Sequence, residues 1–69
     1  MINMTGLIVR SVKPGFLMPI EEDDSWRYVI LVNDIEVQDE SVFWTAADAR
    51  YEMSRDVERL REQAGLVHA

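Results

Sequence analysis

The chain has 69 residues, a mass of 8.0 kDa, no cysteine and a formal net charge of −6. With 48% hydrophobic and 29% charged residues it has the composition of a folded chain, and we expect residues 1–69 to form a single domain. So small a core needs support, and because cysteine is absent and only one histidine is present, neither disulfides nor a zinc site can supply it; we therefore expect a homodimer.

The N-terminal sequence Met1-Ile2-Asn3-Met4 lacks the basic stretch and long apolar run of a signal peptide. Apolar runs elsewhere, such as Tyr28 to Val32, are far too short to cross a bilayer. We therefore expect a cytoplasmic protein that does not associate with a membrane.

The first third of the chain predicts a strand, a turn and an apolar segment. Residues 4–12 are rich in β-branched side chains and predict a strand, which Lys13-Pro14-Gly15 ends in a turn. The apolar segment Phe16 to Ile20 contains Pro19, which cannot donate to a central ladder, so it is predicted as an edge strand or an extended loop. Four adjacent carboxylates, Glu21 to Asp24, cannot be buried together and predict a solvated turn.

Residues 26–38 predict a central hairpin. Asn33-Asp34 is a two-residue turn whose members tolerate the left-handed conformation, and the alternation of side chains resumes at 35–38. Both faces of the strand before the turn are largely apolar, which favours one face on the core and the other partly covered, for instance by a second subunit. The first face carries Trp26, Tyr28, Ile30 and Val32, and the second carries Arg27, Val29 and Leu31.

Residues 46–64 predict a helix. Thr45 is a good N-cap with Asp48 three residues later, Trp44 can form a hydrophobic staple with Ala49, and Gly65 is suited to end the helix. One face is an apolar stripe of Ala46, Ala49, Met53, Val57, Leu60 and Ala64. The opposite face is predicted to meet water and carries Glu52, Arg55, Asp56, Glu58, Arg59, Arg61 and Glu62.

Together these elements predict an α+β fold, in which a small antiparallel sheet of two to four strands packs against one C-terminal helix. The apolar residues of the hairpin and the helix are first of all candidates for the core. Because the helix stripe could also pair with another subunit, we predict a dimer interface at Trp26, Tyr28, Met53, Val57 and Leu60.

Catalysis is not expected, and neither a metal nor a cofactor is predicted. His68 lies next to the C-terminus, where a catalytic geometry is hard to hold, and without cysteine or a second histidine no triad, thiol nucleophile or zinc site can form within one chain. Residues 21–24 lack the spaced oxygen ligands and central glycine of a calcium loop. No glycine-rich phosphate loop is present.

Binding to another protein is the predicted activity. Phe43 and Trp44 are adjacent aromatic residues before the helix, and since neighbouring rings rarely face the same way, one is expected to pack and the other to serve as an exposed anchor. The apolar segment is covered either by the chain itself or by a partner. The full predicted surface consists of Phe43, Trp44, Phe16, Leu17 and Met18, with Glu21, Glu22, Asp23 and Asp24 as its acidic rim.

Nucleic acid is not a predicted direct partner, because phosphate binding needs a local excess of lysine and arginine. Residues 21–40 hold eight acidic residues and one arginine, and residues 41–69 hold five acidic residues and four arginines. This acidity instead favours encounter with a basic protein surface, although solubility alone would also favour it.

In size, acidity and strand-then-helix layout, with a helix opened by Thr45-Ala46-Ala47-Asp48, the chain resembles the small early proteins with which bacteriophages disable host factors. Among these it is similar to the quorum-sensing anti-activators of Mu-like Pseudomonas phages. The resemblance implies a dimeric inhibitor in the host bacterial cytoplasm that binds a LuxR-type transcriptional activator, and a pilus assembly ATPase as a further partner. The alternative is an antitoxin or small repressor whose sheet dimerises and whose helix grips a toxin.

Overall fold

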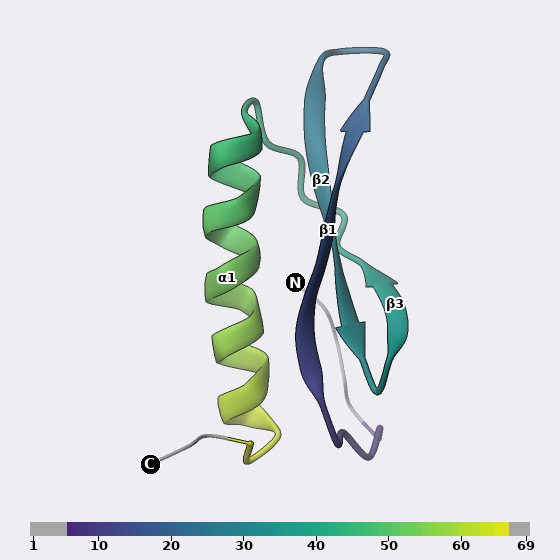
Figure 1. The fold of residues 1–69 in the computed structure, drawn as a ribbon, viewed down its shortest axis with the longest axis vertical. Coiled ribbons are helices and arrows are strands. Elements are labelled where there is room, and N and C mark those ends of the chain that lie inside the picture. The colour runs from purple at the N-terminus through teal and green to yellow at the C-terminus, as the bar shows by residue number, and fades with distance from the viewer. Residues whose placement is uncertain (1–5, 67–69) are drawn as a thin grey trace.

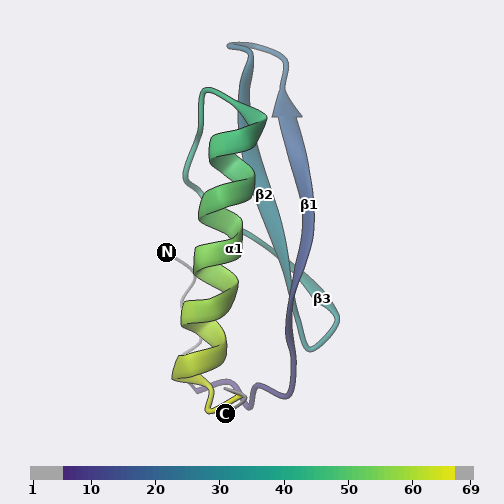
Figure 2. The ribbon, with the colours of Figure 1, turned by 60° about the vertical axis from the view of Figure 1, so that its left-hand side comes forward.

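The computed structural model describes residues 6–66, which form a three-stranded antiparallel sheet and one helix (Figures 1 and 2). The strands are β1 (Val12–Ile20), β2 (Ser25–Val32) and β3 (Ile35–Gln38), and the helix is α1 (Ala46–Gln63). The strand order β1-β2-β3 follows the chain, so both connections within the sheet are hairpins. This is the predicted α+β arrangement, with the sheet packed against a C-terminal helix.

β1 lies further along the chain than the sequence predicted. The strand predicted over residues 4–12 is wrong for residues 6–11, which form no strand, whereas Val12 is the first residue of β1 and residues 4 and 5 lie outside the described residues. The turn predicted at Lys13-Pro14-Gly15 is also wrong, since β1 continues through it to Ile20. The segment predicted as an edge strand or a loop is the second half of this edge strand.

A bulge explains how a strand can pass through a proline-glycine pair. The pairing of β1 with β2 shifts register between Pro14 and Phe16, which makes Gly15 the extra residue. A Cβ atom at Gly15 would clash with the backbone carbonyl of Val29, so only glycine fits this close approach. Pro14-Gly15, which has the sequence pattern of a turn, is therefore part of a bulge at which β1 bends.

Both prolines of β1 lie at positions that face the free edge of the sheet. Trp26 exchanges backbone hydrogen bonds of 2.7 and 2.8 Å with Phe43, on the side of β2 away from β1. Alternate residues of a strand direct their backbone groups to the same side, so Ile30 also directs its N–H and carbonyl away from β1. Pro19 pairs with Trp26 and Pro14 pairs with Ile30, so neither proline is at a position that would donate a hydrogen bond to β2. The free edge of β1 thus lacks two N–H donors, which discourages the addition of another strand.

The predicted β2–β3 turn is confirmed, and it has a second role. Asn33 and Asp34 have φ angles of 53° and 63°, as a two-residue hairpin turn of this type requires. The Asn33 side chain accepts hydrogen bonds from the backbone N–H groups of Arg10 (2.6 Å) and Ser11 (3.3 Å) and donates one to the Ile8 carbonyl (2.8 Å). One side chain thus holds the segment that leads into β1.

The helix begins and ends as its capping residues predict. The Thr45 hydroxyl accepts a hydrogen bond of 3.0 Å from the Asp48 N–H. At the other end Gly65 has a φ of 75°, its N–H donates to the Glu62 carbonyl (3.1 Å), and the next N–H, of Leu66, donates to the Arg61 carbonyl (2.8 Å). These two bonds form a Schellman motif, with Ala64 as the C-cap instead of the last helical residue.

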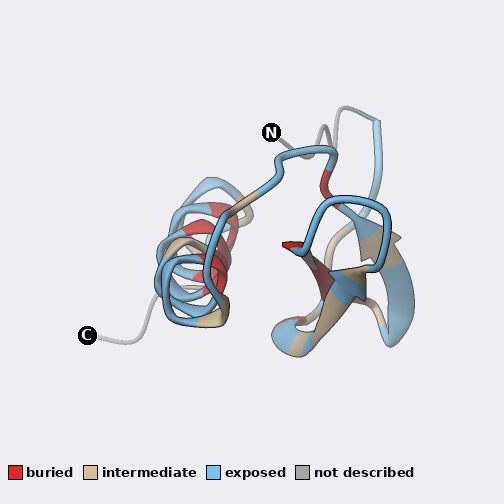
Figure 3. Cartoon of the chain, turned by 90° about the horizontal axis from the view of Figure 1, so that it is seen from above, coloured by how far each residue is buried: buried red, intermediate tan, exposed pale blue. Residues whose placement is uncertain are grey.

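The core lies between α1 and the sheet face that it covers, and the buried side of the helix faces the sheet in Figure 3. β1, β2 and α1 all contribute to it, and Leu17, Val37 and Leu66 pack around it. Its buried members are Val12, Tyr28, Ile30, Val32, Met53, Val57 and Leu60.

The prediction that Asp56 lies on the water-facing side of the helix is wrong. Its side chain is buried, with 2% exposure, and its carboxylate accepts a hydrogen bond of 2.6 Å from the Tyr28 hydroxyl and forms an ion pair with Arg59. The spacing explains the position, because Asp56 follows Met53 by three residues and precedes Leu60 by four, which places it on the core stripe. A buried carboxylate is tolerated there because both partners reach it.

Candidate functional site

One end of the molecule brings two exposed features together. The turn between β1 and β2 and the start of α1 lie at the same end in Figure 1, whereas the β2–β3 turn and the end of α1 lie at the other. The first end carries the acidic turn, residues 21–24, and the loop that enters the helix. The acidic turn and the loop that enters the helix, which are distant in sequence, therefore lie at the same end of the molecule.

The two neighbouring aromatic residues behave differently. Phe43 is held by its backbone pairing with Trp26, and its ring stacks on Tyr28 with a centroid separation of 5.8 Å. Trp44 is 76% exposed, so it forms no buried staple with Ala49, which is itself fully buried. The structure thus assigns packing to Phe43 and exposure to Trp44, and the predicted staple is wrong.

The acidic turn is exposed and partly self-organised. Asp23 accepts hydrogen bonds from the Ser25 N–H (3.2 Å) and from the Ser25 hydroxyl, which is buried, and Asp24 has a φ of 56°. One carboxylate therefore fixes the turn while the other three extend from it. Beside them is a shallow pocket of about 260 Å³, lined by Pro19, Ile20, Glu21, Asp24, Ser25 and Trp26.

The apolar segment is divided between two faces of the sheet. Leu17 pairs with Tyr28 and packs against the core, so it is not available to a partner. Phe16 and Met18 pair with residues of the opposite face, and Phe16 is 45% exposed. The predicted partner surface is therefore not one patch, because β2 lies between Phe43 and β1.

The predicted dimer interface needs a larger correction. Tyr28, Met53, Val57 and Leu60 are 0–7% exposed and form the core of the chain itself, and Trp26 is half-buried. The four core side chains offer no surface to a second copy unless the helix leaves the sheet. A dimer would have to use another face.

Polar groups around Tyr28 hold the helix to the sheet. Burial raises the pKa of Tyr28 to about 12, and the charge of Asp39 adds to this effect. Asp39 is buried as well, which by itself raises its pKa, but hydrogen bonds from Ser41 hold the pKa below its usual value. At neutral pH the tyrosine hydroxyl is therefore a fixed donor to Asp56 and not an acid or base for chemistry.

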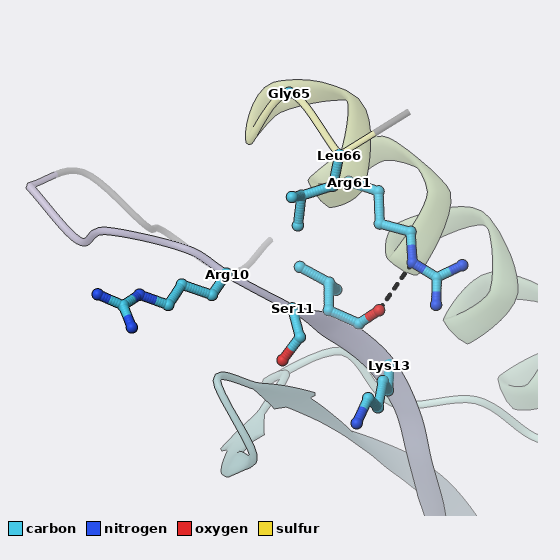
Figure 4. A pocket seen from close by; sticks show the side chains of 7 residues that line it. Arg10, Ser11, Lys13, Arg61, Gly65 and Leu66 are labelled. Carbon is cyan, nitrogen blue, oxygen red and sulfur yellow. Dashed lines mark hydrogen bonds between the residues drawn. The ribbon is translucent and has the colours of Figure 1, made fainter. Parts of the chain in front are cut away.

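A basic cavity of about 470 Å³ lies at the other end of the molecule, between the start of β1 and the end of α1 (Figure 4). Arg10, Lys13 and Arg61 line it, but their charged groups do not converge. The Arg61 Nε donates to the Val12 carbonyl (2.7 Å), Lys13 pairs with Asp34 (3.3 Å), and Arg10 points away from Arg61 in Figure 4. The cavity is therefore not a preformed anion site, and the wide sequence separation of its residues hid it from sequence analysis.

Sequence analysis also missed an exposed aromatic residue on the helix. Tyr51 is 63% exposed, and the guanidinium carbon of Arg55 lies 5.7 Å from its ring centroid. Tyr51 lies two residues after Ala49 and two before Met53, which puts it on the helix face opposite the apolar stripe, so this spacing was the available signal. Trp44, Tyr51 and Arg55 are residue types enriched at the centres of protein interfaces.

Within residues 6–66 no group of three His, Cys, Asp or Glu side chains could hold a metal ion, and His68 lies outside the described residues. In the same part of the chain, no helix is long and apolar enough to cross a membrane. Comparison of the chain with protein-family models, curated proteins and solved structures found no match.

Proposed function

We propose that the protein binds another protein and inhibits it, with Trp44 as the anchor and the acidic turn, residues 21–24, as the rim. The observation that carries the proposal is the 76% exposure of the Trp44 side chain beside a Phe43 that is fixed to the sheet. Tryptophan is strongly enriched among residues that dominate binding energy. A large ring held outward in a small acidic domain is suited to enter a pocket of a partner.

The backbone on both sides of Trp44 is already ordered. Phe43 is paired with Trp26 before it, and Thr45 caps the helix after it. Binding through Trp44 therefore costs little additional ordering of the main chain. The carboxylates of the acidic turn lie at the same end and favour rapid encounter with a basic surface.

The resemblance to phage anti-activators supplies the first partners to test, namely a LuxR-type transcriptional activator and a pilus assembly ATPase in the bacterial cytoplasm. Blocking such an activator requires no contact between this protein and nucleic acid. An antitoxin is the second candidate, and the exposed pair of Tyr51 and Arg55 on α1 favours it, because a toxin could then grip the helix.

The experiment measures the binding affinity of the wild type, Trp44→Ala and Ile35→Ala for purified candidate partners and for proteins captured from bacterial lysate. Ile35 is the matched control, since it is 67% exposed and lies at the opposite end of the molecule. Trp44→Ala should weaken binding by about 2 kcal/mol, or about 30-fold, mainly through faster dissociation, and Ile35→Ala should not. A folded Trp44→Ala variant with unchanged affinity would refute the proposal, and a loss confined to Tyr51→Ala would favour the antitoxin.

A further inference from the structure

The sheet has a second face that no described segment covers. The register pairs Phe16 with Val29 and Met18 with Arg27, and because paired residues of antiparallel strands point to the same side, these side chains share the face opposite the helix. Figure 3 shows the helix on one side of the sheet only. The apolar residues of this open face are Phe16, Met18, Ile20, Val29 and Leu31, and its polar residues are Lys13, Ser25, Arg27, Glu36 and Gln38.

The open face is more apolar than a solvated sheet face should be. Antiparallel sheets with one wet face normally place polar residues there, whereas five of the eight residues that β1 and β2 place on this face are apolar. Phe16, on the edge strand β1, is 45% exposed, and β2 carries apolar residues on both of its sides. An exposed apolar surface of this kind marks an interaction site.

Arg27 on the open face carries a polar atom that the described part of the chain leaves unpaired. Within residues 6–66 its Nε atom is buried and has no hydrogen-bond partner. A buried donor without an acceptor costs about 1–3 kcal/mol in general, so native structures seldom retain one. Because the chain itself encloses this Nε, an acceptor outside the chain can reach the guanidinium only after the Arg27 side chain turns outward.

The charges of this face favour a second copy of the same chain as its occupant. Two chains of net charge −6 repel each other over most of their surface. The strands place only Lys13, Arg27 and Glu36 among charged residues on this side, since Lys13 and Glu36 both pair with Leu31. A face with both signs of charge is self-complementary in a two-fold dimer, where Glu36 of one copy faces the basic residues of the other.

The remaining routes to a dimer are less favourable. The residues of the helix stripe are buried in the core, and Pro14 and Pro19 remove donors from the free edge of β1. We infer that two copies pack their open faces together, sheet against sheet, with a helix on each outer side. Trp44 is not part of this face, so dimerisation and partner binding can fail separately.

The test measures the molar mass of the full chain by light scattering and sedimentation equilibrium, for the wild type, Phe16→Glu and the control Ile35→Glu. The wild type and the control should be dimers at tens of micromolar. Phe16→Glu should raise the dimer dissociation constant at least about tenfold, because it places a carboxylate in an apolar contact. A monomeric wild type, or a Phe16→Glu variant that dimerises normally, would overturn the inference.

A second pair of variants decides the matter if Phe16→Glu does not fold. The chain has no cysteine, so Met18→Cys and Ile35→Cys each introduce a unique thiol. A short bismaleimide should link two copies of Met18→Cys, but not of Ile35→Cys, at the same concentration. Equal yields for the two variants would contradict the proposed face.

Discussion

The two faces of the sheet differ in what covers them, although β2 supplies apolar residues to both. On one face Tyr28, Ile30 and Val32 are buried against α1. On the other face Val29 is buried among its neighbours in the sheet, while Phe16 remains 45% exposed. The comparison teaches that one helix can complete only one face of such a sheet, and that a strand with two apolar faces predicts a second covering layer.

The largest expected loss of stability follows from a substitution on the face of the sheet that α1 covers. Ile30 is fully buried, so Ile30→Ala should lower the free energy of unfolding by about 2–5 kcal/mol through lost burial and the cavity left behind. Leu31→Ala, one residue later on the open face, should cost much less in the monomer. Urea unfolding at several protein concentrations measures the free energy of unfolding of both variants. Equal losses of stability at high dilution would show that the two faces contribute equally to the stability of the monomer.

The polar contact between the helix and the sheet should contribute less than the apolar core. Tyr28→Phe removes the hydroxyl that donates to Asp56 at 2.6 Å and leaves a buried carboxylate with one partner fewer. We expect a loss of about 1–3 kcal/mol in unfolding free energy, with the dimer retained. The exposed Tyr51→Phe is the matched control and should leave stability unchanged. A neutral Tyr28→Phe would mean that this contact does not stabilise the covered face.

A smaller loss of stability is expected when the hydrogen bonds between Asn33 and the segment before β1 are removed, and the neighbouring Asp34 provides a control. Asn33→Gly keeps the turn conformation but loses the three side-chain hydrogen bonds to residues 8–11, and it should destabilise the fold by about 1–2 kcal/mol. Asp34→Gly relieves a similar positive φ and loses only the exposed ion pair with Lys13, so it should be neutral or slightly stabilising. Thermal melts that show equal effects at the two positions would argue against the role given to Asn33.

The contribution of Tyr28 to the pH dependence of stability should show only in alkali. Burial raises the pKa of Tyr28 from 10.0 to about 12, so its neutral form stabilises the folded state. This contribution is complete below pH 10 and is lost as the pH rises from there through about 12. Melting temperatures over this range should fall, and Tyr28→Phe should reduce the fall. If both proteins show the same pH profile, Tyr28 is not the group responsible.

The elements with strong local signals could be predicted from the sequence. Asn33-Asp34 selects its hairpin turn, and Thr45 and Gly65 set the ends of the helix, because each acts through its own backbone or its immediate neighbours. β1 was misplaced because Pro14-Gly15 has the local signature of a turn, while pairing with β2 and a bulge decide its conformation. Long-range pairing of this kind leaves no local signal.

The candidate sites likewise combine features that have a local sequence signal with features that depend on contacts between distant segments. An exposed anchor among the two aromatic residues was predicted, but which ring is exposed depends on the pairing of Phe43 with Trp26, a contact between distant segments. Asp56 was assigned to water from its charge, although its spacing places it on the core stripe, where Tyr28 reaches it. The predicted dimer interface consists largely of core residues, because the sequence does not show which apolar face of the sheet the helix covers.

The most direct test of the second covering layer is an isotope-filtered NMR experiment on a mixture of labelled and unlabelled protein, which detects contacts between copies only. The predicted result is a set of contacts from the Phe16 ring to side chains of the open face, such as Leu31, in the other copy. Contacts between copies that map to α1, or no such contacts at concentrations where light scattering shows a dimer, would contradict the account.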